Sequence, residues 1–403
     1  MASACAPEVQ SGKVRAVLRL NPAMALFLGA LVPGLYTWFR PQGFGFGHGF
    51  EMVAIAKSLV AQGTFGNPFE PAITGPTAEQ PPLYPLFLAA LIKIFHEPMC
   101  GAAALLANIV VNALIAALLP RLAKIFYGDA LPGIFAGILW IFAMRLMPQW
   151  DTSFTIAGLL LFGWISTRKR GVLAAGLIAG LLSLMNPACL LLAAAWTAYL
   201  VVSRRIPRSG AAMVLIALLC NVPWLIRNYS IWHTLVVRTN FGTTFYSSNN
   251  DCAQASLARD GRNGCFQKTN LVESATELGL LQSLGEVQYE RRRVHDGLAW
   301  VRTHPQRFRQ LTLARIAQFW FPEPDQSPFT VYAIWVITLL SIPGVVLMAR
   351  RRETATWFVL LVWLVYPLMY YIVISCDRYR YPILWTSLLP AGYWLTRFCR
   401  GGK

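Results

Sequence analysis

Three acidic residues that lie far apart in the chain stand at the ends of apolar segments. Glu51 occurs in GFGHGFEMVAIAKSL, Asp151 in RLMPQWDTSF and Asp377 in SCDRYRYP. A carboxylate placed near an acceptor hydroxyl can act as a general base. The structural alternatives are that Glu51 stabilises a helix dipole and that Asp151 caps the helix after it. His48 is either a substrate contact or an ordinary loop histidine.

Arginines accompany these acids. Arg378 and Arg380 flank a tyrosine in DRYRYP, and Arg227 occurs in VPWLIRNY. A guanidinium group binds phosphate through two parallel hydrogen bonds, so these side chains are candidates for binding a donor phosphate. Ordinary anchoring at the membrane interface is the alternative. Tyr84 and Tyr381 are further candidates for substrate contact.

The composition indicates the environment in which this chemistry takes place. Of 403 residues, 56% are hydrophobic and 13% are charged, and several apolar stretches are long enough to span a bilayer. Because backbone polar groups must be paired in lipid, long apolar runs without period-two alternation predict membrane helices. Almost no ionisable residue falls in the middle of a predicted span, which argues against a proton-coupled or ion-coupled transporter.

The net charge of +17 is distributed in clusters between apolar segments. Clusters at the ends of every second span are typical of cytoplasmic loops, whereas a nucleic-acid-binding patch is the weaker interpretation. The clusters comprise Lys13, Arg15, Arg19; Arg121, Lys124; Arg168, Lys169, Arg170; Arg204, Arg205, Arg208; Arg350, Arg351, Arg352; and Arg397, Arg400, Lys403.

We expect an all-α polytopic membrane protein with about ten transmembrane helices, juxtamembrane helices and both termini in the cytoplasm. Residues 81–95, which contain PPLYP, would form a helix of about 22 Å, shorter than the hydrocarbon core of about 30 Å. A full crossing there would invert every later charge cluster, so we expect a juxtamembrane helix on the outer face. The predicted spans are 22–40, 99–120, 131–149, 152–167, 171–186, 188–203, 210–226, 330–349, 355–374 and 382–399.

The chain therefore divides into three regions. Residues 1–226 form a membrane region with an acidic first external loop at 41–98, residues 227–329 form a partly helical external region, and residues 330–403 form the last membrane helices. In the external region we predict two helices broken at His304-Pro305. The second is amphipathic and basic, and either lies on the membrane surface or packs on a core of the loop itself.

The cysteines show no metal-binding spacing. Cys252 and Cys265 lie in the long polar loop, where a disulfide and two free thiols are both open alternatives if the loop is extracytoplasmic. Five others lie at termini or in apolar runs and are interpreted as small core residues: Cys5, Cys100, Cys189, Cys220 and Cys399.

Several segments occur in a characteristic order over residues 22–390: GFEMVAIAKSLVAQGTFGNPF, TGPTAEQPPLYPLFLAALIKIF, QWDTS, VPWLIRNY, HPQRF and RYRYPI. Together they resemble the bacterial membrane glycosyltransferases of the GT-C superfamily. The group they resemble most is related to family 39, which includes the protein O-mannosyltransferases and the lipid A aminoarabinose transferases.

The resemblance implies a GT-C-like fold and transfer of a sugar from a polyprenyl-phosphate donor to a glycan, lipid or protein acceptor. The reaction would take place on the extracytoplasmic face of the bacterial inner membrane. Glu51 takes the place of the first-loop catalytic acid, Asp151 that of the second acid, and Arg378 and Arg380 are candidates for the donor phosphate. Many relatives carry an aspartate or an acidic pair in the first loop, whereas Glu51 stands alone in this reading.

Other functions remain open at the level of sequence. A transporter or flippase for lipid-linked saccharides would share the arginines without using Glu51 as a base, and a non-catalytic protein of envelope assembly would need neither. No cofactor is required and no nucleic acid is expected. Glu51 and Asp151 could share a divalent metal ion, but two carboxylates make a sparse site, so a metal is not implied.

Overall fold

The computed structural model describes residues 21–40, 46, 49–166, 168, 170–203, 210–323, 328–351 and 353–401. Over these residues the regular structure is helical, and the β-structure is confined to two isolated bridges. The prediction of an all-α fold is therefore confirmed. Among the predicted features, His48 and the basic residues Lys13, Arg15, Arg19, Lys169, Arg204, Arg205, Arg208, Arg352 and Lys403 lie outside the described residues.

Apolar helices occupy the positions of the predicted spans. Four stretches in the described part of the chain are long and apolar enough to cross a membrane: Met99–Tyr127, Gly210–Trp232, Pro328–Arg350 and Ala355–Ile372. The structure is thus that of a polytopic helical membrane protein, while the crossing of the shorter helices stays a prediction. The helices are α1 (Pro22–Trp38), α4 (Met99–Tyr127), α5 (Leu131–Ala143), α6 (Thr152–Ser166), α7 (Val172–Ser183), α8 (Ala188–Val202), α9 (Gly210–Trp232), α16 (Pro328–Arg350), α17 (Thr354–Val365) and α19 (Tyr381–Cys399).

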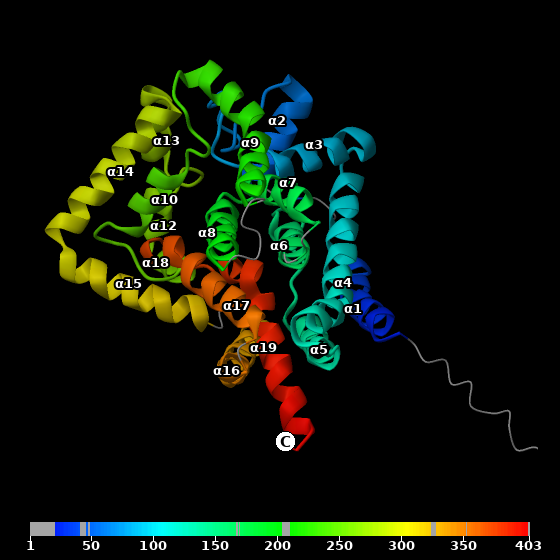
Figure 1. Ribbon diagram of the computed structural model, residues 1–403. Helices are drawn as coiled ribbons and strands as arrows, with labels where there is room; N and C mark the ends of the chain where they lie inside the picture. Colours follow the sequence, from blue (N-terminus) through cyan, green and yellow to red (C-terminus); the bar gives the residue numbers. More distant parts are fainter. Residues whose placement is uncertain are drawn as a thin grey trace, which may run out of the picture.

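The C-terminal ends of α4, α16 and α19 meet at one end of the bundle. The Tyr127 hydroxyl contacts the Met348 sulfur at 3.6 Å, and the Tyr127 and Tyr393 rings are 5.0 Å apart. Arg400 forms an ion pair with Asp129 at 2.8 Å. Figure 1 shows α16 and α19 running to this lower end, where the chain finishes.

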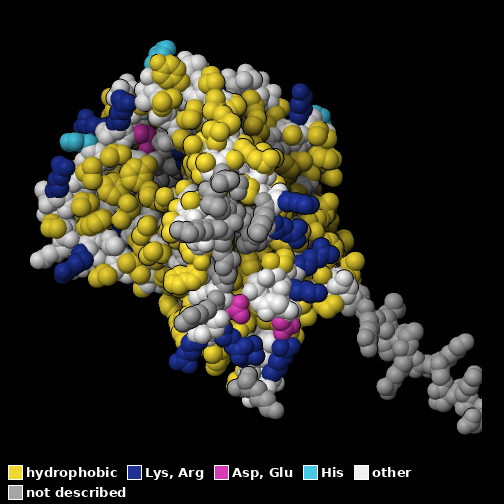
Figure 2. Space-filling view, viewed as in Figure 1, with side chains coloured by type: hydrophobic (Ala, Val, Ile, Leu, Met, Phe, Trp, Pro, Cys, Tyr) yellow, Lys and Arg dark blue, Asp and Glu magenta, His cyan; other side chains and the backbone are white. Residues whose placement is uncertain are grey.

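Basic side chains gather at this same end. Figure 2 shows Lys and Arg side chains around the lower end of the molecule. The helices α4, α16 and α19, whose C-terminal ends meet, each carry residues of a predicted cytoplasmic cluster at that end, as the positive-inside pattern predicts. The clusters are Arg121 and Lys124 on α4, Arg350 and Arg351 at the end of α16, and Arg397 and Arg400 at the end of α19.

The predicted first external loop folds into two helices at the opposite end, α2 (Glu51–Gln62) and α3 (Leu83–Phe95) (Figure 1). They pack together through a buried cluster that includes Met52, Val53, Tyr84 and Leu88. The thirteen residues of α3 reach about 20 Å at 1.5 Å per residue, less than the thickness of the hydrocarbon core. Because α5 also has thirteen residues, length alone does not separate α3 from the predicted spans, and the juxtamembrane interpretation of the PPLYP segment stays a prediction.

The external region is built of short helices beside the bundle. The break at His304 occurs as predicted, between α14 (Glu286–Thr303) and α15 (Pro305–Trp320). The buried residues Leu311, Arg315 and Phe319 of α15 face protein, and Arg315 donates hydrogen bonds to Asn249 Oδ1 (3.1 Å) and to the Ile372 carbonyl (3.2 Å). The amphipathic face of α15 therefore packs on α18 and its neighbours, not on a core of the loop alone. The remaining elements are α10 (Phe241–Ser248), α11 (Leu257–Asn263), α12 (Cys265–Thr269), α13 (Ala275–Leu284), α18 (Leu368–Ile372) and the 3-10 helix η1 (Asp377–Arg380).

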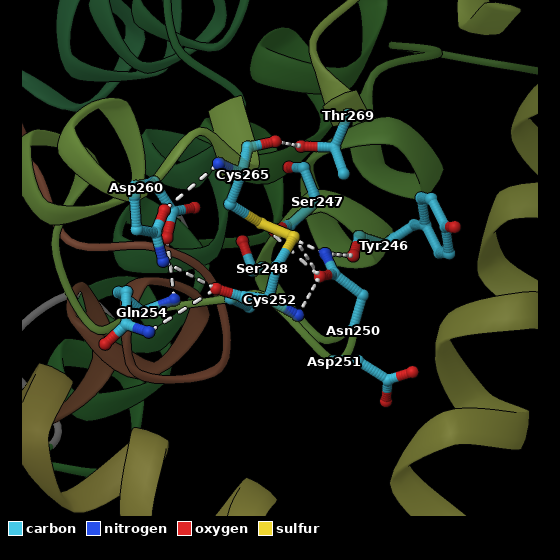
Figure 3. Close-up of a disulfide and its surroundings, with 12 residues drawn as sticks. Tyr246, Ser247, Ser248, Asn250, Asp251, Cys252, Gln254, Asp260, Cys265 and Thr269 are labelled. Atoms are coloured by element: carbon cyan, nitrogen blue, oxygen red, sulfur yellow. Dashed lines mark hydrogen bonds between the residues drawn. A yellow bond between two sulfur atoms is a disulfide. The ribbon is translucent and has the colours of Figure 1, made fainter. Parts of the chain in front are cut away.

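Cys252 and Cys265 form a disulfide that joins the segment after α10 to the start of α12 (Figure 3). Asn250 Oδ1 accepts a hydrogen bond from the Cys252 amide at 3.0 Å, and buried Asp260 accepts one from the Gln254 amide at 2.6 Å. Burial raises the pKa of Asp260 to about 6. The bridge and these bonds fix the segment between α10 and α12, which contains α11.

Candidate functional site

Glu51 is the first residue of α2, and the packing of the residues after it determines where its side chain lies. Met52 and Val53 are buried against α3, and Gly63 ends the helix with a left-handed φ of 67°. Glu51 is only partly buried as a residue, but its Oε2 is enclosed and has no hydrogen-bond partner among the described residues. Burial raises the pKa of Glu51, and the charge of Arg378 opposes this effect.

Asp151 lies just before α6, and a polar network on α4 holds that helix start in place. The Ser153 hydroxyl donates to Asn108 Oδ1 and accepts from Asn112 Nδ2, both at 2.9 Å. The carboxylate of Asp151 accepts a hydrogen bond from the Thr155 hydroxyl at 2.7 Å. Burial raises the pKa of Asp151, while Thr155 and then Arg378 lower it.

Arg378 brings these two acids to one place. Its guanidinium carbon lies 3.4 Å from the centre of the Trp150 ring, and the edge of Trp150 meets Phe50 with ring centres 6.0 Å apart. Phe50 and Trp150 immediately precede Glu51 and Asp151, so η1, α2 and α6 meet around one tryptophan. The charge of Arg378 acts on both carboxylates. The structure therefore joins three of the predicted residues, which are separated by about 100 and more than 200 positions in the chain.

Asp377, the third acid of the sequence analysis, has a different partner. It forms an ion pair with Arg145, which lies between α5 and α6, and it accepts a hydrogen bond from the Arg378 amide at 2.7 Å. Asp377 therefore shapes the segment that carries Arg378.

Glu79 is a site residue that the sequence analysis did not assign. It is 8% exposed, its Oε1 accepts hydrogen bonds from the side-chain amides of Gln80 (3.0 Å) and Asn240 (3.4 Å), and its Oε2 is buried without a partner among the described residues. Burial raises the pKa of Glu79 to about 8, and the charge of Glu51 contributes to the same rise. The interpretation that Glu51 is a lone acid of the first loop is therefore wrong, because its charge acts on a second buried acid, Glu79.

Arg238 is the second residue that was missed. It donates hydrogen bonds to the Glu79 carbonyl (2.8 Å) and to Gln80 Oε1 (2.9 Å), and its charge lowers the pKa of Glu51 and of Asp151. The sequence did contain a signal for Glu79, because AEQPP places an acid directly before two prolines that start a helix. Nothing local in VVRTNF distinguishes Arg238, since its contacts are made across 159 positions.

Arg380 lies in a separate, apolar setting. It is 1% exposed, donates a hydrogen bond to the Ser387 hydroxyl at 2.8 Å, and its guanidinium carbon lies 4.0 Å from the centre of the Trp320 ring. Two of its nitrogens, Nε and Nη1, have no partner among the described residues. Burial lowers the pKa of Arg380 to about 9. The unpaired nitrogens keep Arg380 a candidate for anion binding.

Arg227 is engaged by the backbone. It donates hydrogen bonds to the carbonyls of Thr77 (2.7 Å) and Phe65 (2.8 Å), and it lies near the rings of Trp224 and Phe65. These contacts hold the first external loop against α9, so the structure gives Arg227 a positioning role. Phosphate binding by Arg227 stays a prediction.

Tyr84 and Tyr381 also make structural contacts. The Tyr84 hydroxyl donates to the Pro148 carbonyl and the Tyr381 hydroxyl to the Ala143 carbonyl, both at 2.8 Å. Both side chains are buried. These bonds fix the segment between α5 and α6, which carries Trp150.

No group of three or more His, Cys, Asp or Glu side chains in the described part of the chain is arranged to hold a metal ion. The charges of Arg378 and Arg238 act on both acids of the site, Glu51 and Asp151. The arrangement is therefore suited to moving a proton near a bound anion.

The chain matches no protein family model and no curated protein. Among solved structures it is similar to the crystal structure of ArnT from Cupriavidus metallidurans bound to undecaprenyl phosphate. The two share 13% sequence identity with a TM-score of 0.41, and the match covers 94% of this chain and 78% of that one. The fold and site themselves define a polytopic helical membrane protein that encloses acids and an arginine at one end of its bundle.

Proposed function

We propose that this protein is a membrane glycosyltransferase that transfers a sugar from a polyprenyl-phosphate donor to an acceptor at the extracytoplasmic face. The observation that carries the proposal is the convergence of Glu51, Asp151 and Arg378 around Trp150. The sequence resemblance to the GT-C enzymes supports the same assignment. It implies that Glu51 and Asp151 are the two acids of the reaction and that Arg378 binds the donor phosphate.

The reaction proposed is an inverting displacement. Glu51 accepts the proton of the acceptor hydroxyl, whose oxygen attacks the anomeric carbon while the bond from that carbon to the phosphate oxygen breaks. A raised pKa suits Glu51 to this role, because a carboxylate with higher proton affinity is a stronger base. The electron pair of the broken bond leaves with the lipid phosphate.

Arg378 stabilises the charge that develops on the leaving phosphate. Its ring stack on Trp150 fixes the guanidinium plane in advance, which is the condition for efficient electrostatic stabilisation of a transition state. Asp151 adds a negative charge that acts on Arg378, and its carboxylate can accept a hydrogen bond from a sugar hydroxyl. The unpaired nitrogens of Arg380 offer a second phosphate contact.

A cavity of about 250 Å³ suits the acceptor. It lies between α10 and α14, and Arg238 belongs both to its lining and to the acidic site. In this proposal the acceptor enters from the aqueous side beneath residues 227–329. The lining residues are Val236, Arg238, Thr239, Phe241, Gly242, Val287, Glu290, Arg291 and Val294.

The orientation proposed follows from the two ends of the bundle. The basic ends of α4, α16 and α19 face the cytoplasm, and the site at the opposite end faces the outside. This places the polyprenyl chain of the donor against the apolar helices and its phosphate at the level of Arg378.

The experiment that tests the proposal is release of free polyprenyl phosphate from a panel of polyprenyl-phosphate sugars. Membranes would contain the wild type, Glu51→Gln, Asp151→Asn or the control Glu70→Gln, which removes a half-exposed acid of the same loop. We expect release by the wild type and the control, and a loss of about 100-fold or more in Glu51→Gln. Equal release by wild type and Glu51→Gln contradicts the base role, and absence of release from a folded wild type favours the transporter or assembly alternatives.

A further inference from the structure

Two buried carboxyl oxygens of the first external loop lack hydrogen-bond partners among the described residues, Oε2 of Glu51 and Oε2 of Glu79. Buried oxygens of ionised carboxylates are strongly disfavoured without partners. The hydrogen bonds of Arg238 go to the Glu79 carbonyl and to Gln80 and do not reach either carboxylate. Protonation of one of the two carboxyls removes the cost of a second buried negative charge that acts on the first.

The surroundings of Glu79 favour its protonated form. Burial is the largest effect on its pKa, the negative charge of Glu51 adds to it, and Glu286 and Glu290 of α14 act in the same direction. The positive charge of Arg238 opposes this rise. The oxygens of Glu286 and Glu290 already accept hydrogen bonds, from the Ala78 amide at 2.8 Å and from the Thr243 amide at 3.1 Å.

We propose that Glu79 is the second acid of the first loop, a protonated carboxyl that keeps the Glu51–Glu79 pair at one negative charge while Glu51 acts as the base. This inference rests on the proposed function and adds a positioning residue to it. Adjacent carboxyls resist a second ionisation, so a neutral Glu79 allows Glu51 to remain ionised.

The proton inventory of the step is simple. Glu79 holds one proton throughout, and Glu51 gains the proton of the acceptor hydroxyl as the sugar–phosphate bond breaks. Ionisation of Glu79 would add a second negative charge close to an anionic donor, and would thereby weaken donor binding.

The consequence is a specific pH dependence. Because the pKa of Glu79 is raised to about 8, the group is protonated at neutral pH and loses its proton as the pH rises through about 8. We expect wild-type release to decline above that pH, to about a tenth one pH unit higher if the ionised form is inactive. Glu79→Gln should lose this alkaline decline and stay within about tenfold of wild type at pH 7, because an amide copies the neutral acid.

The control is Glu70→Gln, which should keep the wild-type alkaline decline because Glu70 is half-exposed and paired with Lys57. An unchanged alkaline decline in Glu79→Gln would overturn the proposal. A folded Glu79→Gln protein with activity as low as that of Glu51→Gln would overturn the proposal as well. If a neutral Glu79 is the active form, its neutral amide variant should retain activity.

A second measurement does not depend on activity. Infrared spectra of the wild type should show a protonated carboxyl band that disappears as the pH rises through about 8 and that is absent in Glu79→Gln. If Glu79→Gln removes no protonated carboxyl band at neutral pH, Glu79 is ionised there and the inference is wrong, whatever the catalytic result. If the band titrates but no sugar donor is turned over, the protonation stands and the proposed function fails.

Discussion

Arg378 is the residue whose replacement tests the site most directly. Its guanidinium stacks on Trp150 at 3.4 Å and its charge acts on Glu51 and Asp151. Arg378→Lys keeps the positive charge and removes the planar fork and the stack, whereas Arg378→Ala removes all three. The two variants together separate charge from geometry.

The magnitudes follow from these contacts. A cation over an aromatic ring contributes about 0.5 to 2 kcal/mol, so Arg378→Lys should slow release by about tenfold. Loss of a donor that stabilises transition-state charge costs about 2.7 to 4 kcal/mol, so Arg378→Ala should slow release by about 100-fold to 1,000-fold. Arg378→Ala should also move the acid limb of the pH profile upward, because the cation that lowers the pKa of Glu51 is gone.

The assay is the initial rate of polyprenyl phosphate release at several donor concentrations and pH values. The matched control is Arg259→Gln, which breaks a partly exposed ion pair with Glu323 and should cost about 1 kcal/mol or less of stability. A release rate of Arg378→Ala equal to that of the control would refute the role of Arg378. An acid limb that stays in place in Arg378→Ala would refute the electrostatic link to Glu51.

Three further predictions address the site and its surroundings. The acid limb of wild-type release should lie above pH 4.5, because burial raises the pKa of Glu51 and the base form is lost as the pH falls through that raised value; a limb at or below 4.5 would contradict the burial of this carboxylate. Reduction of the disulfide, or Cys252→Ser, should destabilise the external region by about 2 to 4 kcal/mol, since the bridge closes a loop between residues 13 positions apart, and a melting temperature unaffected by reductant would argue against it. A cysteine at Ile73, which is 74% exposed in the first loop, should react with an impermeant thiol reagent from outside the cell, and one at Lys124 only after the cytoplasmic side is opened; the reverse pattern would invert the proposed topology.

The sequence by itself determined the class of structure. Long apolar runs without period-two alternation predicted helices, which pair their backbone polar groups internally in lipid. The basic clusters predicted that the C-terminal ends of α4, α16 and α19 lie on the same side of the membrane. The break at His304-Pro305 was predictable for a local reason, because a proline favours the first turn of a helix and restricts the residue before it. The exact helix ends were less predictable: α5 ends at Ala143 and not near 149, since the residues after it form the turn that carries Trp150.

The sequence also named Glu51, Asp151 and Arg378 as candidates from residue type and context. Only the tertiary structure decided which of the candidates meet. Arg227 has the same side chain as Arg378, yet it donates its hydrogen bonds to backbone carbonyls of the first loop. The hydroxyls of Tyr84 and Tyr381 likewise donate to backbone carbonyls. Such assignments depend on contacts between distant segments, which no local pattern encodes.

Glu79 shows most clearly what could not be predicted from the sequence alone. As a residue in AEQPP it is one acid before two prolines, and its chemistry comes from enclosure and from the charge of Glu51 brought close by the packing of α2 on α3. The residue types available for catalysis could thus be recognised from the sequence, because they depend on side-chain chemistry. Their proton affinities and partnerships were decided by the fold, because burial and charge act through space.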